Sequence, residues 1–170
     1  MTNNKRTNSF KQSPQLAASL MRPFVDGARL QVERLLSSQQ MLKHDPIIAV
    51  QHCHHETSNL FEDLATVIQY LNLSGITSKQ DQSYKDVRDL IRHDIREEFD
   101  NDEKRKNDRA IRLGLNPKMQ FEMSYDVGSI KIGQSIITLQ EITSFINIAE
   151  RVMNALLLGL KIELENKDEK

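Results

Sequence analysis

The residues with the clearest chemical potential lie in the stretch KDVRDLIRHDIREEF, residues 85–99. Its apolar residues recur at three- and four-residue steps, which predicts an amphipathic helix. At 100° per residue, the side of that helix opposite the apolar stripe carries Arg88, Asp89, Arg92 and His93. The sequence therefore gathers two cations, a carboxylate and an imidazole on one polar face.

These four side chains suit phosphate chemistry. Asp89 and His93 are four residues apart, so the carboxylate can hydrogen-bond one ring nitrogen of the imidazole and fix its tautomer. Arg88 and Arg92 form a second adjacent pair. Guanidinium groups bind phosphate oxygens, and imidazole transfers protons near neutral pH, so this face can handle a phosphodiester without a metal. The alternative is a solvated face whose ion pairs each contribute about 0.3 kcal/mol.

The composition indicates one domain with no global preference for nucleic acid or membrane. The 170 residues, 38% of them hydrophobic, suffice for one core, and 23 Lys+Arg against 24 Asp+Glu give a net charge of -1. The single cysteine, Cys53, forms no internal disulfide, and the first residues contain no signal-peptide core. The longest apolar run, ALLLGL, is too short to span a membrane. We expect a cytoplasmic protein that does not bind membrane.

Four helices and a hairpin are expected between a polar tail at 1–12 and another at 165–170. Leu16, Leu20, Phe24, Ala28, Val32, Leu35 and Leu36 mark a first helix in which Pro23 favours a kink. Asp45 and Pro46 end it and begin a second helix, which runs to about Leu73 with a buried stripe of Leu60, Leu64, Val67 and Leu71. The stretch around residues 85–99 is the third helix.

Alternation at Met123 and Tyr125, and again at Ile130 and Ile132, predicts a short β-hairpin. The TLQE sequence at 138–141 has capping-box spacing and begins the last helix, with a stripe of Ile142, Ile146, Ala149, Met153, Leu156 and Leu160. The predicted fold class is all-α: one domain, residues 13–164, forming a four-helix bundle with a short β-hairpin inserted before the last helix.

The RDLIRH sequence, residues 88–93, in the third helix of this arrangement resembles the signature of the HEPN family (higher eukaryotes and prokaryotes nucleotide-binding domain). That signature is an arginine, an asparagine or other polar residue, three further residues and a histidine. The resemblance covers loosely residues 47–160 and implies that Arg88, Asp89 and His93 are the catalytic residues, with Asp89 where asparagine is commonest. It also implies a metal-independent endoribonuclease that dimerises through this helical face and brings two signature pairs into one cleft.

Other features offer weaker candidates. The HCHHE sequence, residues 52–56, contains metal-ligand types, but a helix points Cys53 into the core and turns His52 and His55 to other sides. We therefore expect no metal and no cofactor, and assign His52, Glu56 and Asp63 as second-shell candidates bordering the third helix. A charged segment supplies candidate RNA contacts at Lys104, Arg105, Lys106 and Arg109, although interleaved acids favour a solvated loop.

Three functions are considered from the sequence, the third being a metal-binding bundle that would use His52 and Glu56. The first is an RNA-cleaving HEPN-like homodimer of the toxin or phage-defence kind, with a protein partner or cognate inhibitor. The second is a noncatalytic helical module that uses the same face to dimerise or to bind a protein, nucleotide or RNA.

Overall fold

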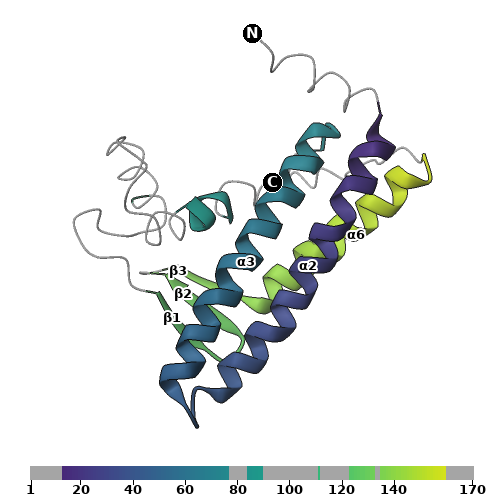
Figure 1. Cartoon of the computed structure of the whole chain (residues 1–170). Coiled ribbons are helices and arrows are strands. Elements are labelled where there is room, and N and C mark those ends of the chain that lie inside the picture. Colours follow the sequence, from purple (N-terminus) through teal and green to yellow (C-terminus); the bar gives the residue numbers. More distant parts are fainter. Residues whose placement is uncertain (1–12, 77–83, 90–110, 112–122, 133–134, 160–170) are drawn as a thin grey trace, which may run out of the picture.

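The computed structural model describes residues 13–76, 84–89, 111, 123–132 and 135–159. The elements in chain order are α2 (Pro14–Met41), α3 (Pro46–Leu73), a helical segment at 84–89, β1 (Met123–Asp126), β2 (Ser129–Ile132), β3 (Ser135–Thr138) and α6 (Leu139–Leu157) (Figure 1). This part of the chain is mostly helical, with a small antiparallel sheet before the last helix, which confirms the coarse prediction. The predicted tails, 1–12 and 165–170, lie outside the described residues.

The helices α2 and α3 form an antiparallel pair joined by a tight connection (Figure 1). The Asp45 side chain accepts a hydrogen bond from the Ile48 amide at 3.2 Å, and Pro46 occupies the first turn of α3. Aspartate satisfies an amide that has no partner inside the helix, and proline has no amide to satisfy there. The predicted boundary between the first two helices is confirmed.

The buried face of α2 differs from the predicted leucine stripe. Leu16 and Leu20 are 46% and 40% exposed, whereas the residues buried along this helix include Ala17, Ala18, Met21, Val25, Ala28 and Leu35. Because α2 packs against both α3 and α6, its alanines lie where neighbouring backbones approach closely, and large leucines lie at the margin. Pro23 lies within the continuous helix and does not end it.

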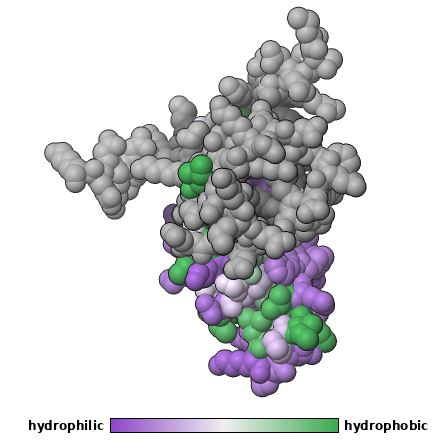
Figure 2. Space-filling view, turned by 90° about the vertical axis from the view of Figure 1, so that its left-hand side faces the viewer, coloured by the Kyte–Doolittle hydropathy of each residue, from purple (hydrophilic) through white to green (hydrophobic). Residues whose placement is uncertain are grey.

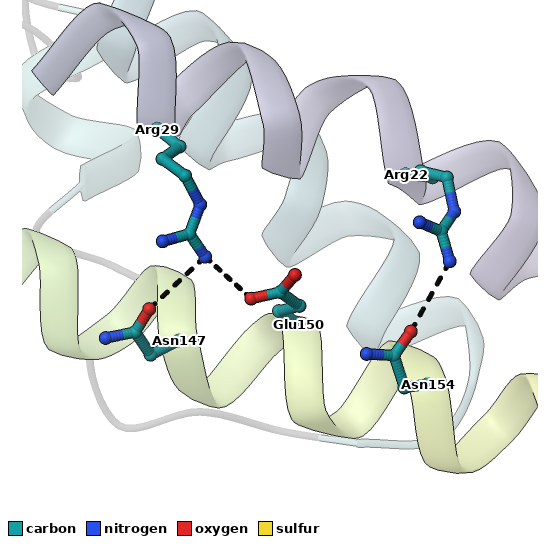
Figure 3. A network of polar contacts seen from close by, with 5 residues as sticks. All are labelled: Arg22, Arg29, Asn147, Glu150 and Asn154. Atoms are coloured by element: carbon teal, nitrogen blue, oxygen red, sulfur yellow. Dashed lines mark hydrogen bonds and ion pairs between the residues drawn. The ribbon is translucent and has the colours of Figure 1, made fainter. Parts of the chain in front are cut away.

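Polar contacts fix the direction of α6 along α2. Arg22 donates to Asn154 at 3.4 Å, and Arg29 donates to Asn147 at 3.2 Å and to Glu150 at 2.6 Å (Figure 3). The earlier residue of α2, Arg22, contacts the later residue of α6, Asn154, and Arg29 contacts the earlier residue Asn147. The two helices are therefore antiparallel. The side chains of the Arg29–Glu150 pair are 41% and 40% exposed, and ion pairs with this much contact with solvent contribute roughly 0.2–1 kcal/mol each.

The sheet has one strand more than the predicted hairpin. In the order β1-β2-β3, Tyr125 pairs with Ile130, and Ile130 pairs with Ile137 on the additional strand β3. Ile130 and Ile132 point into the core and are fully buried. The hairpin prediction is confirmed. The strand β3 adds a third strand to the hairpin, and small sheets need three or more strands, or packing against a helix, to be stable.

The turn between β1 and β2 is held by a buried glutamine of α2. The Gly128 amide donates to Gln39 Oε1 at 2.8 Å, and Gln39 Nε2 donates to the Ser129 carbonyl at 2.9 Å. The Gly128 carbonyl in turn accepts from the Leu139 amide at 2.8 Å. The left-handed φ of 86° at Gly128 favours glycine. This turn therefore joins α2, the sheet and the start of α6.

The helix α6 begins with the predicted capping box. The Glu141 amide donates to Thr138 Oγ1 at 3.2 Å, and Glu141 Oε2 accepts from the Thr138 amide at 2.9 Å. These hydrogen bonds favour the carboxylate and lower the pKa of Glu141. The predicted apolar stripe of α6 is buried as far as Leu156, and Leu160 lies outside the described residues.

Some apolar side chains gather at the surface beside the connection of α2 and α3. Met41, Ile47 and Ile48 are exposed, Ile47 to 74%. Figure 2 shows hydrophobic surface at the lower end of the molecule, the end where α2 turns into α3 in Figure 1. Exposed apolar surface of this kind is a common feature of binding regions. None of the described helices combines the length and apolar character needed to cross a membrane.

Candidate phosphate-binding site

The helical segment 84–89 is anchored by aromatic contacts. The Tyr84 ring meets the Phe61 ring of α3 with centroids 5.8 Å apart and the Phe145 ring of α6 at 5.4 Å, both edge to face. Val87, one turn further on, is fully buried. One side of the segment therefore joins the core formed by α3 and α6, which fixes where the remaining side chains emerge.

The same segment carries a partly exposed ion pair. Arg88 Nε and Nη2 both donate to Asp89 Oδ1, at 2.9 Å and 2.7 Å. The exposed fractions of the two side chains are 23% and 21%, so the pair lies at the edge of the core, within reach of solvent. Sequence analysis placed both residues on one polar face but did not predict that they pair with each other.

The rest of the predicted cluster cannot be placed beside this pair. Arg92 and His93 lie outside the described residues, as do the candidate RNA contacts Lys104, Arg105, Lys106 and Arg109. The predicted hydrogen bond between Asp89 and His93 therefore stays a prediction. What the structure supplies is one guanidinium, held by its neighbouring carboxylate, on a segment anchored by Tyr84.

A second carboxylate of this segment, Asp86, was missed by sequence analysis. Its exposed fraction is only 2%. Helical spacing places Asp86 away from the apolar stripe, so periodicity gave no signal that it is buried. Its burial adds an acidic group to the same helical turn as Arg88.

The three residues predicted to border the third helix from α3, His52, Glu56 and Asp63, lie in different surroundings. His52 is exposed, whereas Glu56 is buried and its Oε2 atom has no hydrogen-bond partner among the described residues. Asp63 faces Gly27 of α2 so closely that a methyl group at that glycine would collide with the carboxylate. Phe61, which contacts Tyr84, lies about 200° away around α3. Asp63 therefore faces α2, and its predicted place beside the polar face of the third helix stays a prediction, because Arg92 and His93 lie outside the described residues.

Close packing of Asp63 against α2 has an electrostatic cost. Burial, with a smaller contribution from the negative charge of Glu62, raises the pKa of Asp63 from its ordinary value of 3.8 to about 6. The folded protein therefore binds the proton more tightly than the unfolded chain does. The stabilisation that this provides is complete below pH 4 and is lost as the pH rises through about 6.

We expect Asp63→Asn to stabilise the protein at pH 7 by about 1–2 kcal/mol, a value reduced for screening because the side chain is half-buried. The advantage over the wild type should shrink as the pH falls from 7 to 4. Urea unfolding at these pH values measures it, with Asp26→Asn on the exposed side of α2 as the control. A gain in unfolding free energy that does not change with pH would contradict the raised pKa of Asp63.

The HCHHE sequence does not converge on one point. Cys53 is buried and its pKa is raised to about 11 by burial, as expected for an inert core thiol. His54 Nδ1 hydrogen-bonds the Tyr125 hydroxyl at 3.1 Å, and His55 hydrogen-bonds Asn59 at 3.1 Å. Within the described ranges, no three or more His, Cys, Asp or Glu side chains are grouped as a metal site requires.

The contact between His54 and Tyr125 was also missed by sequence analysis. The two rings meet edge to face with centroids 5.3 Å apart, so β1 packs across the first half of α3. Burial raises the pKa of Tyr125 well above its ordinary range, which keeps the phenol neutral. The alternation that predicted the strand did indicate that Tyr125 and Met123 share a face.

No family model, curated protein or solved structure compared with the chain matches it.

Proposed function

We propose that the chain is a HEPN-like, metal-independent endoribonuclease that acts as a homodimer. The observation that carries the proposal is the placement of Arg88. Its guanidinium lies at the edge of the core, on a helical segment held against α3 and α6 by Tyr84. A fixed backbone with a partly exposed guanidinium is what orientation of a phosphodiester requires.

The proposed reaction uses two side chains. His93 takes the proton from the ribose 2′-hydroxyl, and the 2′-oxygen attacks the adjacent phosphorus. The bond from phosphorus to the 5′-oxygen breaks, and that oxygen takes a proton from water, which regains one from the protonated His93. Arg88 stabilises the negative charge that grows on the other phosphate oxygens. The products are a 2′,3′-cyclic phosphate and a 5′-hydroxyl end.

The proposal includes the finer arrangement expected from the sequence. In it, the segment 84–89 belongs to the third helix of a four-helix bundle, and this helix brings His93 close to Asp89. Two copies of the chain then place two Arg88 and His93 pairs in a shared cleft. This arrangement gives the polar face a role that a solvated face would lack.

The second candidate function is a noncatalytic module that binds a protein, nucleotide or RNA through the same face. The ion pair between Arg88 and Asp89 favours it, because a neutralised guanidinium contributes less to catalysis than a free one. The same pair suits an interface that needs a defined, nearly neutral surface.

Cleavage of labelled single-stranded RNA in EDTA distinguishes these functions. We expect the wild type to cut, and His93→Ala and Arg88→Ala each to lower the rate by about 100-fold, the usual contribution of a positioned proton-transfer group. Arg34→Ala, which removes an exposed arginine from α2, is the matched control and should cut normally. Melting curves establish that every variant is folded.

Normal cutting by both site variants would remove these residues from the mechanism. A wild type that cuts no RNA but forms a dimer, lost on reversing the charge at Arg92, would support the noncatalytic module instead.

A further inference from the structure

We propose that Asp89 is an internal competitor for the phosphate that Arg88 binds, so that it limits the affinity of the protein for RNA. The inference rests on the proposed function, because it concerns how the same arginine meets its substrate. Asp89 thereby sets the strength of substrate binding, without itself touching the reacting atoms.

The geometry of the ion pair carries the argument. Two donors of the Arg88 guanidinium, Nε and Nη2, converge on the single oxygen Oδ1 of Asp89 at 2.9 Å and 2.7 Å. A phosphate oxygen that engages this edge of the guanidinium needs the same two donors in the same fork. Asp89 Oδ1 therefore occupies the position that a phosphate oxygen would take.

The charge of Asp89 acts in the same direction. An ionised carboxylate in contact with the guanidinium cancels its field, and it repels a phosphate that approaches. The two side chains are only 23% and 21% exposed, so solvent and salt screen them less than they screen a fully exposed pair.

Competition also requires that the pair can open. Asp89 and Arg88 are neighbours in sequence, so their contact closes no long loop and holds no two elements together. Turning the carboxylate away leaves the anchors of the segment, Tyr84 and Val87, in place. Phosphate can thus displace Asp89 from Arg88 without releasing the segment from the core.

The test measures binding separately from cleavage. The probe is a fluorescent 20-nucleotide RNA with 2′-O-methyl groups throughout, which lacks the attacking hydroxyl. Fluorescence anisotropy gives its Kd for the full chain. We expect Asp89→Asn, which removes the charge and keeps the shape, to tighten binding by about tenfold. The gain should disappear when Arg88→Gln is added, because the competition is for that guanidinium.

Asp26→Asn is the matched control, since it makes the same change in net charge on the exposed side of α2. It should change Kd less than about twofold. If Asp89→Asn lowers the melting temperature, Asp89→Ser takes its place with the same expected result.

The outcomes separate the inference from the proposed function. Equal affinity of wild type and Asp89→Asn, with weaker binding by Arg88→Gln, would overturn the competition and leave the RNA-binding role of Arg88 standing. A gain that persists beside Arg88→Gln would also overturn it, because general repulsion would then explain the effect. No binding by wild type or Asp89→Asn would overturn the inference and the proposed RNA substrate together.

Discussion

Replacing Tyr84 by alanine is expected to lower the free energy of unfolding by about 3–4 kcal/mol, within the range for deleting a buried aromatic ring. The ring is 4% exposed and meets both Phe61 and Phe145 edge to face. Its removal leaves a cavity where α3, α6 and the segment 84–89 meet, and two aromatic pairs are lost with it. Urea unfolding followed by circular dichroism measures the change.

Tyr84→Phe is the control, because it keeps the ring and removes only the hydroxyl. We expect it to remain within about 1 kcal/mol of the wild type. Burial, with a smaller contribution from the charge of Glu141, raises the pKa of Tyr84 to about 12, so the phenol is neutral at pH 7 and no charge is lost. A destabilisation by alanine below 1 kcal/mol would show that the segment is not anchored through this ring.

Replacing Gln39 by leucine is expected to cost about 2–3 kcal/mol. Gln39 is fully buried, and its amide serves both the Gly128 amide and the Ser129 carbonyl. Leucine has a similar volume but leaves one donor and one acceptor of the turn without partners. Because the unpaired groups dominate, the added apolar surface offsets only part of the loss.

Gln40→Leu, one residue further along the same helix, is the matched control. Gln40 is exposed, so the same substitution there should change the unfolding free energy by less than about 0.5 kcal/mol. Amide hydrogen exchange adds a local measurement, since the Gly128 amide should lose protection in Gln39→Leu. Unchanged protection at Gly128 would contradict the role given to Gln39.

The parts of the fold that sequence predicted correctly are those set by local chemistry. Asp45 followed by Pro46 determines where α3 begins, and Thr138 with Glu141 determines where α6 begins, because these residues act on the backbone beside them. The stripe that includes Leu60 and Leu64 was also correct, since large apolar residues at helical spacing have few alternatives to burial.

The features that were not predicted from the sequence depend on how helices and strands that are distant in the chain pack together. Ala17 and Ala18 are buried because α2 lies against two helices, and alanine gives little hydrophobic signal by itself. The strand β3 is four residues long and runs directly into the capping box, so its alternation was too short to distinguish it from the helix start. Gln39 is polar, and nothing local indicates that a turn some 90 residues away will need its amide.

Sequence predicted that Arg88 and Asp89 share a polar face, but it did not predict the contact between them. Helical spacing selected Arg88 and Asp89 as members of a polar face, which matches their partial exposure. Helical spacing predicted a contact between residues four apart, Asp89 and His93. The structure shows the Arg88 side chain bent towards the carboxylate of Asp89, the next residue in the chain. Periodicity describes where side chains leave a helix, and the flexibility of arginine decides where its guanidinium ends.

The order in which the elements occur in the chain has a consequence during synthesis. The pair formed by α2 and α3 is complete once Leu73 has left the ribosome. Asn154, the partner of Arg22, emerges 132 residues after Arg22. Residues leave the ribosome from the N-terminus onward, at about 5–20 residues per second. The nascent helical pair therefore leaves Phe61 without the Tyr84 ring that packs against it, and leaves α2 without its partner α6. Chains that stall before α6 should depend on chaperones to avoid aggregation.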